Sequence, residues 1–221
     1  KPSPTIQERP TNNTTDETLA KHLTVSKDTE NFQQQPTAGF SPVLVIDSWK
    51  LGANALKEWT GKSTATIVFD SIVDEYTRLG LFRSVVHLPN IAIIAFTTQG
   101  DVFGGFYSVS VKKTSKTYFD RSVFIFSFQS HGRCFTPQRF VVTKNMEHEA
   151  YVEFQTPYRD YGFVRFWVYG CGGFYLGNEK SRTWCWDLSQ GFEGIDNTTL
   201  TGLNRWTYPH VCMRLVAVHL S

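Results

Sequence analysis

Residues 91–106 read IAIIAFTTQGDVFGGF, and this stretch decides how the fold is organised. The first half is an uncharged apolar run, and Gln99-Gly100-Asp101 after it is typical of a tight turn. Because the chain then enters a second apolar run, we predict a β-hairpin. Two adjacent glycines, Gly104 and Gly105, lie in its second strand. Since glycine has no Cβ atom, an aromatic ring or a neighbouring chain can approach the backbone closely there.

The rest of the chain after this hairpin has the pattern of an antiparallel β protein. Aromatic residues make up 15% of the sequence, with 18 Phe and 6 Trp, and they suit the half-buried surface of a sheet. Short apolar segments are separated by turn residues and do not alternate with helices as βαβ units would. We predict an α+β fold, predominantly β: a two-sheet antiparallel β-sandwich flanked by a few short helices. Strands after the hairpin are predicted at Ser122–Phe128, Arg139–Thr143, Tyr151–Gln155, Phe163–Tyr169, Gly173–Gly177, Thr183–Asp187 and Val211–Leu220.

Two helices and one strand are predicted before the hairpin. Ile46–Trp59 has a broad apolar face and is followed by Gly61, which suits a left-handed C-terminal cap. Thr64–Asp70 is predicted as a strand and Thr77–Val86 as the second helix. Four apolar side chains of that helix are expected to face the interior: Leu79, Phe82, Val85 and Val86.

Residues 1–40 differ in kind from the rest of the chain. They are rich in Thr, Asn, Gln, Pro, Glu and Lys, and Phe32 and Phe40 are the only aromatic residues among them. Such a composition cannot bury enough apolar surface to offset the entropy lost on folding. We therefore predict a flexible tail or linker at 1–40 and one folded domain at 41–221.

The charge of the chain argues for no particular partner. The formal net charge is +2, whereas a dedicated nucleic-acid-binding protein usually has a concentrated basic face. The densest basic cluster lies in a predicted loop, which is interpreted either as a solvated loop or as a contact surface for an acidic partner. It consists of Lys112, Lys113, Lys116 and Arg121.

The four cysteines are scattered without a C-x-x-C pair, so a zinc site built from close thiolate pairs is not expected. We expect buried, reduced thiols. No run of the sequence approaches the roughly 18 apolar residues of a membrane-spanning helix.

Two groups of ionisable residues invite a chemical interpretation. Asp70 and Asp74 flank a predicted turn and could hold calcium or transfer protons, but capping of the following helix needs fewer partners and is preferred. His148 lies between Glu147 and Glu149. Because neighbouring side chains on a strand or loop diverge, we expect a solvated acidic loop here and not a metal site.

The late glycine-rich and tryptophan-rich segments are interpreted as strands. Residues 170–177, GCGGFYLG, superficially resemble a dinucleotide-binding loop, but that loop must lie between a strand and a helix. Trp184 and Trp186 alternate around Cys185, so both lie on one face of a strand. We expect that face to be core; the alternative is an exposed platform for stacking bases or sugars.

Several of these segments together resemble the TLDc domain of the oxidation-resistance protein family, over roughly residues 43–220. The hexapeptide at 101–106 is similar to the family's most recognisable motif, an acidic or polar residue before V-F-G-G-[YF], and residues 122–128 resemble its S-F-L-F-S-L strand. The last predicted strand departs from the family, with Arg214 and His219 where an acidic residue and a Trp are usual. The residues that carry the resemblance are Asp70, Ser71, Asp101, Phe103, Gly104, Gly105, Phe106, Gly172, Gly173, Ser181 and Cys185.

The resemblance implies a sandwich of two antiparallel sheets without catalytic residues, cofactor or metal. It also implies protection against oxidative stress and, in some members, association with the vacuolar proton ATPase. We therefore expect a non-catalytic protein-interaction domain in the cytoplasm, with the nucleus as a second location. The residues expected to contact a protein partner are Lys112, Lys113, Lys116 and Arg121.

Two other functions stay open at this point. Cys171 and Cys185, or the Asp70–Asp74 region, would serve a redox-responsive or hydrolytic enzyme, and the thiols would then need a depressed pKa and exposure. A basic loop at 112–121 would bind nucleic acid, and its retention on a polyanionic resin would depend strongly on salt.

Overall fold

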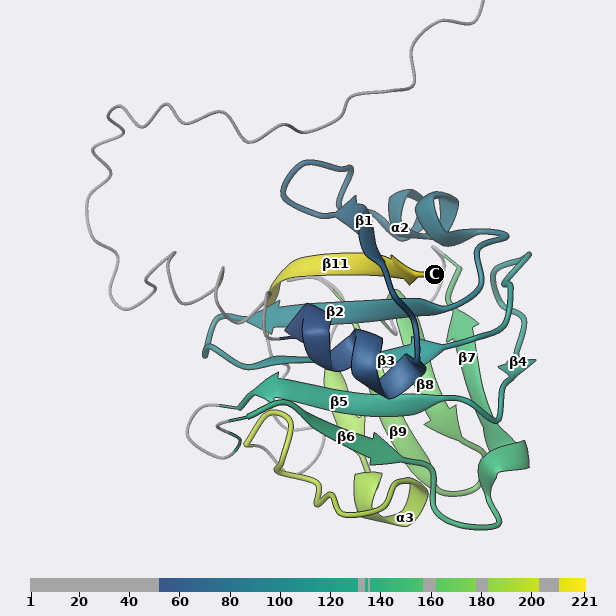
Figure 1. Ribbon diagram of the computed structural model, residues 1–221, viewed down its shortest axis with the longest axis vertical. Coiled ribbons are helices and arrows are strands. Elements are labelled where there is room, and N and C mark those ends of the chain that lie inside the picture. The colour runs from purple at the N-terminus through teal and green to yellow at the C-terminus, as the bar shows by residue number, and fades with distance from the viewer. Residues whose placement is uncertain (1–51, 131–133, 135, 157–161, 178–182, 203–210) are drawn as a thin grey trace, which may run out of the picture. The chain divides into compact units, whose positions relative to one another are not determined.

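The computed structural model describes residues 52–130, 134, 136–156, 162–177, 183–202 and 211–221 (Figure 1). The predicted tail at 1–40, the start of the first predicted helix and Ser181 lie outside these residues.

Two antiparallel sheets form the predicted sandwich. The six-stranded sheet has the order β1 (Ala65–Asp70), β11 (Cys212–Leu220), β2 (Ile91–Thr97), β3 (Val102–Tyr107), β5 (Phe124–Gln129) and β6 (Gln138–Val141). The five-stranded sheet has the order β10 (Trp184–Trp186), β9 (Gly172–Leu176), β8 (Val164–Val168), β7 (Ala150–Phe154) and β4 (Tyr118–Phe119). In Figure 1 five strands of the first sheet, β11, β2, β3, β5 and β6, run across the view, and β7, β8 and β9 run behind them in a different direction.

The predicted hairpin is formed by β2 and β3, which pair in antiparallel register. At the turn, the backbone N–H of Thr97 donates to the carbonyl of Asp101 at 3.0 Å, and Gly100 has a φ of +88°. Glycine adopts this left-handed conformation without strain. β2 is buried along its whole length because one face meets the interior between the sheets and the other meets a separate apolar cluster. Burial on both faces explains why its sequence is apolar without alternation.

A helix at residues 52–60 covers the outer face of the six-stranded sheet (Figure 1). Leu56 is fully buried there, and Trp59 packs against apolar side chains from β2, β3, β5 and β11. Gly61 follows the helix with a φ of +67°, so the left-handed conformation predicted for it is confirmed. The outer face of this sheet is therefore part of the core.

The second predicted helix is α2 (Arg78–Val85). The Thr77 side chain caps it by accepting a backbone N–H from the first turn at 3.0 Å. Leu81 and Val85, which are four residues apart and so share a face, are buried. Leu79 was predicted to face the interior, but it is 45% exposed because the helix turns the Leu81 side inward instead.

The strands predicted after the hairpin are all present, whereas three short elements were not predicted. These are β4, the 3-10 helix η1 (Glu147–Glu149) and α3 (Leu188–Gly191). Each has at most four residues, which is too short for a periodic pattern. Within the part of the chain that the structure describes, no helix is long and apolar enough to cross a lipid bilayer.

Candidate functional site

The glycine pair after the hairpin turn lets the two sheets approach closely. Gly105 faces the five-stranded sheet, where an added Cβ atom would lie 2.5–2.7 Å from three carbons of the Phe166 ring. Phe166 is stacked on Phe174 with ring centroids 5.3 Å apart, and Phe103 meets Phe174 edge-on at 5.8 Å. Gly104 faces the opposite side of the strand. Aromatic rings therefore fill the space between the sheets at this motif.

Asp101, the acidic residue of the motif, is 1% exposed and serves the hairpin turn. Its backbone N–H donates to Thr97 Oγ1 at 3.1 Å, and its carboxylate accepts from the same hydroxyl at 3.4 Å. These hydrogen bonds join the ends of β2 and β3. The role of Asp101 at this position is thus to close the turn.

The Cys185 thiol lies in the interior between the sheets. Burial raises its pKa to about 12; a hydrogen bond with Thr201 lowers the pKa, and the charge of Asp101 raises it. Burial also raises the pKa of Cys212 to about 11. Because only a thiolate is a strong nucleophile, neither group is reactive at neutral pH. Of the other two cysteines, Cys134 is buried and Cys171 is half-buried.

We expect Cys185 and Cys212 to resist alkylation in the folded protein and to react fully in denaturant. Iodoacetamide treatment near neutral pH, followed by mass spectrometry of the peptides, measures this directly. Fast modification of native Cys185 would support the redox alternative instead.

The same thiols should make stability fall at high pH. In the folded protein both thiol pKa values are raised above 9.0, the ordinary value. Above pH 9 the thiols of the unfolded chain therefore lose their protons while the buried thiols keep theirs, so the stability that is complete below pH 9 falls as the pH rises. Each thiol should lower the free energy of unfolding by up to about 1.4 kcal/mol per pH unit above that point. Cys185→Ala should flatten the fall in urea midpoint between about pH 9 and 11, and Cys171→Ala is the control.

Asp70 is ion-paired with Arg214 at the end of β1. Arg214 Nε lies 2.9 Å from Asp70 Oδ1, and Nη2 lies 2.5 Å from Oδ2. The guanidinium also lies over the Phe96 ring, 5.3 Å from its centroid. Asp74 accepts the backbone N–H of Asp70 at 2.7 Å, so it closes the turn before α2. The expectation that these two acids cap α2 was wrong, since Thr77 is the cap.

The contacts of the Asp70 carboxylate join two strands, β1 and β11. Besides the Arg214 contacts, it accepts the backbone N–H of Ile72 at 3.1 Å. Ser71 extends the junction: its N–H donates to the Leu215 carbonyl at 2.9 Å, and its hydroxyl accepts the Leu215 N–H at 2.9 Å. This site holds β1 against β11 and does not present two free carboxylates to a substrate.

Gly172 and Gly173 lie in β9, which confirms the strand interpretation of the glycine-rich segment. A Cβ atom on Gly172 would overlap the Trp186 carbonyl oxygen, and one on Gly173 would overlap the Phe166 carbonyl oxygen. Backbone of the neighbouring strands therefore passes close to both glycines. The segment itself is a strand of the sheet, whereas a phosphate-binding loop would begin a helix within it.

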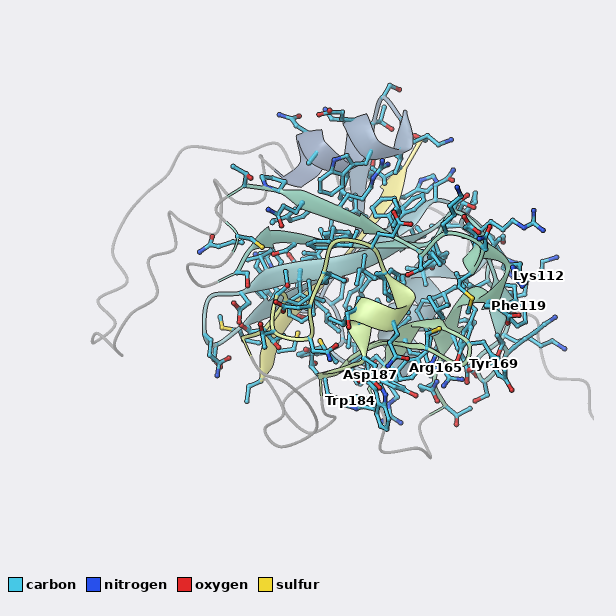
Figure 2. The ribbon with its side chains drawn as sticks, turned by 90° about the horizontal axis from the view of Figure 1, so that it is seen from below. Lys112, Phe119, Arg165, Tyr169, Trp184 and Asp187 are labelled. Atoms are coloured by element: carbon cyan, nitrogen blue, oxygen red, sulfur yellow. The ribbon has the colours of Figure 1, made fainter. Side chains whose placement is uncertain are left out.

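The outer face of the five-stranded sheet is aromatic, and it is seen from the side in Figure 2. Because Cys185 faces the interior between the sheets, alternation along β10 places Trp184 and Trp186 on the opposite face of the strand. Trp184 is buried there at 8% exposed, as expected for a core position, whereas Trp186 is half-buried. Trp184 stacks on Tyr175 at 4.4 Å and meets Trp167 edge-on at 6.0 Å.

Arg165 lies among these outer aromatic side chains. Its guanidinium contacts Glu153 Oε2 through Nη2 at 2.5 Å and Nε at 3.1 Å, and donates to the Tyr175 hydroxyl at 3.0 Å. It also lies 4.9 Å from the centroid of the Tyr151 ring, and burial raises the pKa of Tyr151 to about 12. Figure 2 shows Tyr169, which is 66% exposed, on the same side of the molecule. The rings around Arg165 are packed on one another and do not form an open stacking platform.

The basic residues predicted as partner contacts are divided between two places. The backbone N–H groups of Lys112 and Lys113 donate to the Tyr118 hydroxyl at 2.9 and 2.7 Å, and the Lys116 ammonium lies 5.4 Å from the centroid of the Tyr118 ring. Arg121 instead lines a groove on the six-stranded sheet, to which the three lysines do not contribute. The loop is thus organised by Tyr118.

His148 lies in η1 with its side chain 58% exposed, and its Nε2 atom is 3.3 Å from Glu149 Oε1. Among the described residues, no three His, Cys, Asp or Glu side chains are grouped so that they could hold a metal ion.

A groove of about 640 Å³, which no sequence pattern predicted, lies beside the C-terminal end of the first helix. Phe106 and Phe124, stacked with centroids 4.9 Å apart, lie at its base, and Trp59 meets Phe124 edge-on at 6.0 Å. We name it the cationic groove, because four cations outnumber two carboxylates among the residues that line it: Lys62, Arg121, Arg139, Lys144, Glu147 and Glu193. Arg121 was the only one of these predicted to meet a partner.

The comparisons with known proteins agree with the architecture. Residues 43–162, more than half of the 221-residue chain, match the family model of the TLDc domain. The matched range contains the hairpin motif and the strand at 122–128. No curated protein gives a significant match to the chain.

Proposed function

Because the chain belongs to the TLDc domain family, we propose that it is a non-catalytic domain that acts by binding a protein partner. One observation carries this proposal: the thiol and the carboxylate that an enzyme would use are already buried or bonded within the fold. The Cys185 thiol is buried with a pKa of about 12, and the Asp70 carboxylate is bonded to Arg214 and to backbone. By contrast, three cations of the cationic groove are exposed to solvent: Arg121, Arg139 and Lys144.

The proposed cellular role is protection against oxidative stress through the vacuolar proton ATPase. The resemblance to the oxidation-resistance proteins supports this part of the proposal. The partner is then the cytosolic catalytic sector of the pump, so the domain acts in the cytoplasm, with the nucleus as a second location. Binding alters the assembly or the activity of the pump.

We expect the full chain to bind the purified cytosolic sector of the vacuolar proton ATPase in at least one nucleotide state. Biolayer interferometry with the sector immobilised, without nucleotide and with ADP or ATP, measures this. The double variant Cys171→Ala/Cys185→Ala should bind as tightly as the natural chain, because docking does not use the thiols. If no nucleotide state gives binding, the proposal that this pump is the partner fails.

A further inference from the structure

The cationic groove has the chemistry to recognise one kind of partner segment. We propose that it docks an acidic segment of a partner protein that also carries large apolar side chains. This inference rests on the proposed function and specifies the partner by its chemistry. Three features lead to it: the cations of the groove, its apolar wall and the second hollow beside it.

The cations around the groove are available to a ligand. Among the described residues, no side chain forms an ion pair with Lys62, Arg121 or Lys144. Arg139 is held in place, since its Nη1 donates to the Trp59 carbonyl at 2.9 Å and its guanidinium lies 5.6 Å from the centroid of the Phe124 ring. A guanidinium that is already held in place is a suitable receptor for carboxylates, because it needs little ordering on binding.

The groove also offers apolar contact beside these charges. Val141 is 39% exposed, and Trp59 is half-buried where it lines the groove. An apolar side chain of a partner would bury surface against them and would add affinity that carboxylates alone do not supply. The expected ligand is therefore amphipathic, with acidic and apolar residues in the same segment.

The surface beside the groove is hollowed as well. A second hollow of about 530 Å³ is lined by Arg121, Asn145, Glu147 and His148, so Arg121 and Glu147 line both hollows. The two hollows are therefore neighbours. An extended peptide segment can contact neighbouring hollows at once.

The burial of two aromatic rings favours a protein segment over nucleic acid. The rings of Phe106 and Phe124 are only 4% and 5% exposed, so their faces are not open for stacking bases.

The test uses the full chain and a fluorescein-labelled synthetic peptide of repeated Leu-Glu-Glu-Leu units, followed by fluorescence anisotropy. Arg121→Glu/Lys144→Glu should weaken binding by about tenfold or more, because two attractive charges become repulsive. Lys112→Glu/Lys113→Glu changes the net charge equally away from the groove and should weaken binding less than about twofold. Arg139 is left unchanged because it donates to the Trp59 carbonyl, and urea midpoints verify that both variants fold.

Several outcomes would overturn the inference. If both variants lose the same affinity for the peptide, the attraction is non-specific. If a peptide with Ser in place of Leu binds as tightly as the Leu-Glu-Glu-Leu peptide, the groove does not recognise apolar side chains and that part of the inference fails. Tighter binding of a single-stranded oligonucleotide would favour a nucleic-acid site. If the groove variant binds the pump sector like the natural chain, the groove inference fails while the proposed function stands. If the natural chain binds the peptide but not the sector, the choice of pump fails and the groove stands.

Discussion

Gly105→Ala should destabilise the domain by about 3 kcal/mol, at the upper end of the cost of overpacking a core. The added methyl group would lie 2.5–2.7 Å from three atoms of the Phe166 ring. That ring cannot move away cheaply, because it is stacked on Phe174 at 5.3 Å and lies 6.3 Å from the Tyr107 ring. For a domain of this size the fall in Tm should be about 6–12 °C, measured by calorimetry or circular dichroism.

The control for this substitution is Gly61→Asn. Gly61 has a φ of +67° with nothing within 4 Å of an added Cβ atom, and asparagine tolerates this conformation. Its effect should stay within about 0.5 kcal/mol. Adding Phe166→Leu to Gly105→Ala should recover part of the loss if the ring is the obstacle. Equal stability of Gly105→Ala and Gly61→Asn would contradict the close approach of the sheets.

Asp70→Ala should cost about 2–3 kcal/mol of unfolding free energy. The substitution leaves the Arg214 guanidinium, only 24% exposed, without the carboxylate that lies 2.5 and 2.9 Å from it. Removing one partner of a buried pair costs about 3–5 kcal/mol, and partial exposure of this pair reduces the figure. Urea unfolding at neutral pH measures the change.

A double-mutant cycle separates the ion pair from the rest of the junction. Asp70→Ala/Arg214→Met should be less destabilised than the sum of the two single variants, with a coupling energy of about 1–2 kcal/mol. The exposed pair of His148 and Glu149 is the control, and His148→Ala should change stability by less than about 0.5 kcal/mol. Additive effects at Asp70 and Arg214 would show that the pair does not hold β1 to β11.

Local patterns predicted the parts of this fold that depend on sequence neighbours. The turn at Gly100, the strand at 122–128 and the left-handed cap at Gly61 each follow from a few adjacent residues. Alternation around Cys185 correctly placed Trp184 and Trp186 on a common face, but it could not say which face meets the other sheet. That choice depends on the sheet that packs opposite, which is a non-local property.

The sequence alone determined the hairpin, most of the strands and the position of the glycine pair, because backbone conformation at these places depends on neighbours along the chain. Tertiary structure decided which side chains meet. Asp70 and Arg214 are 144 residues apart, and the cationic groove combines Lys62, Arg139 and Glu193 from segments that only folding brings together. Charge complementarity between such distant residues leaves no periodic signal in the sequence. The surface that we propose to bind a partner is therefore a product of the packed sandwich.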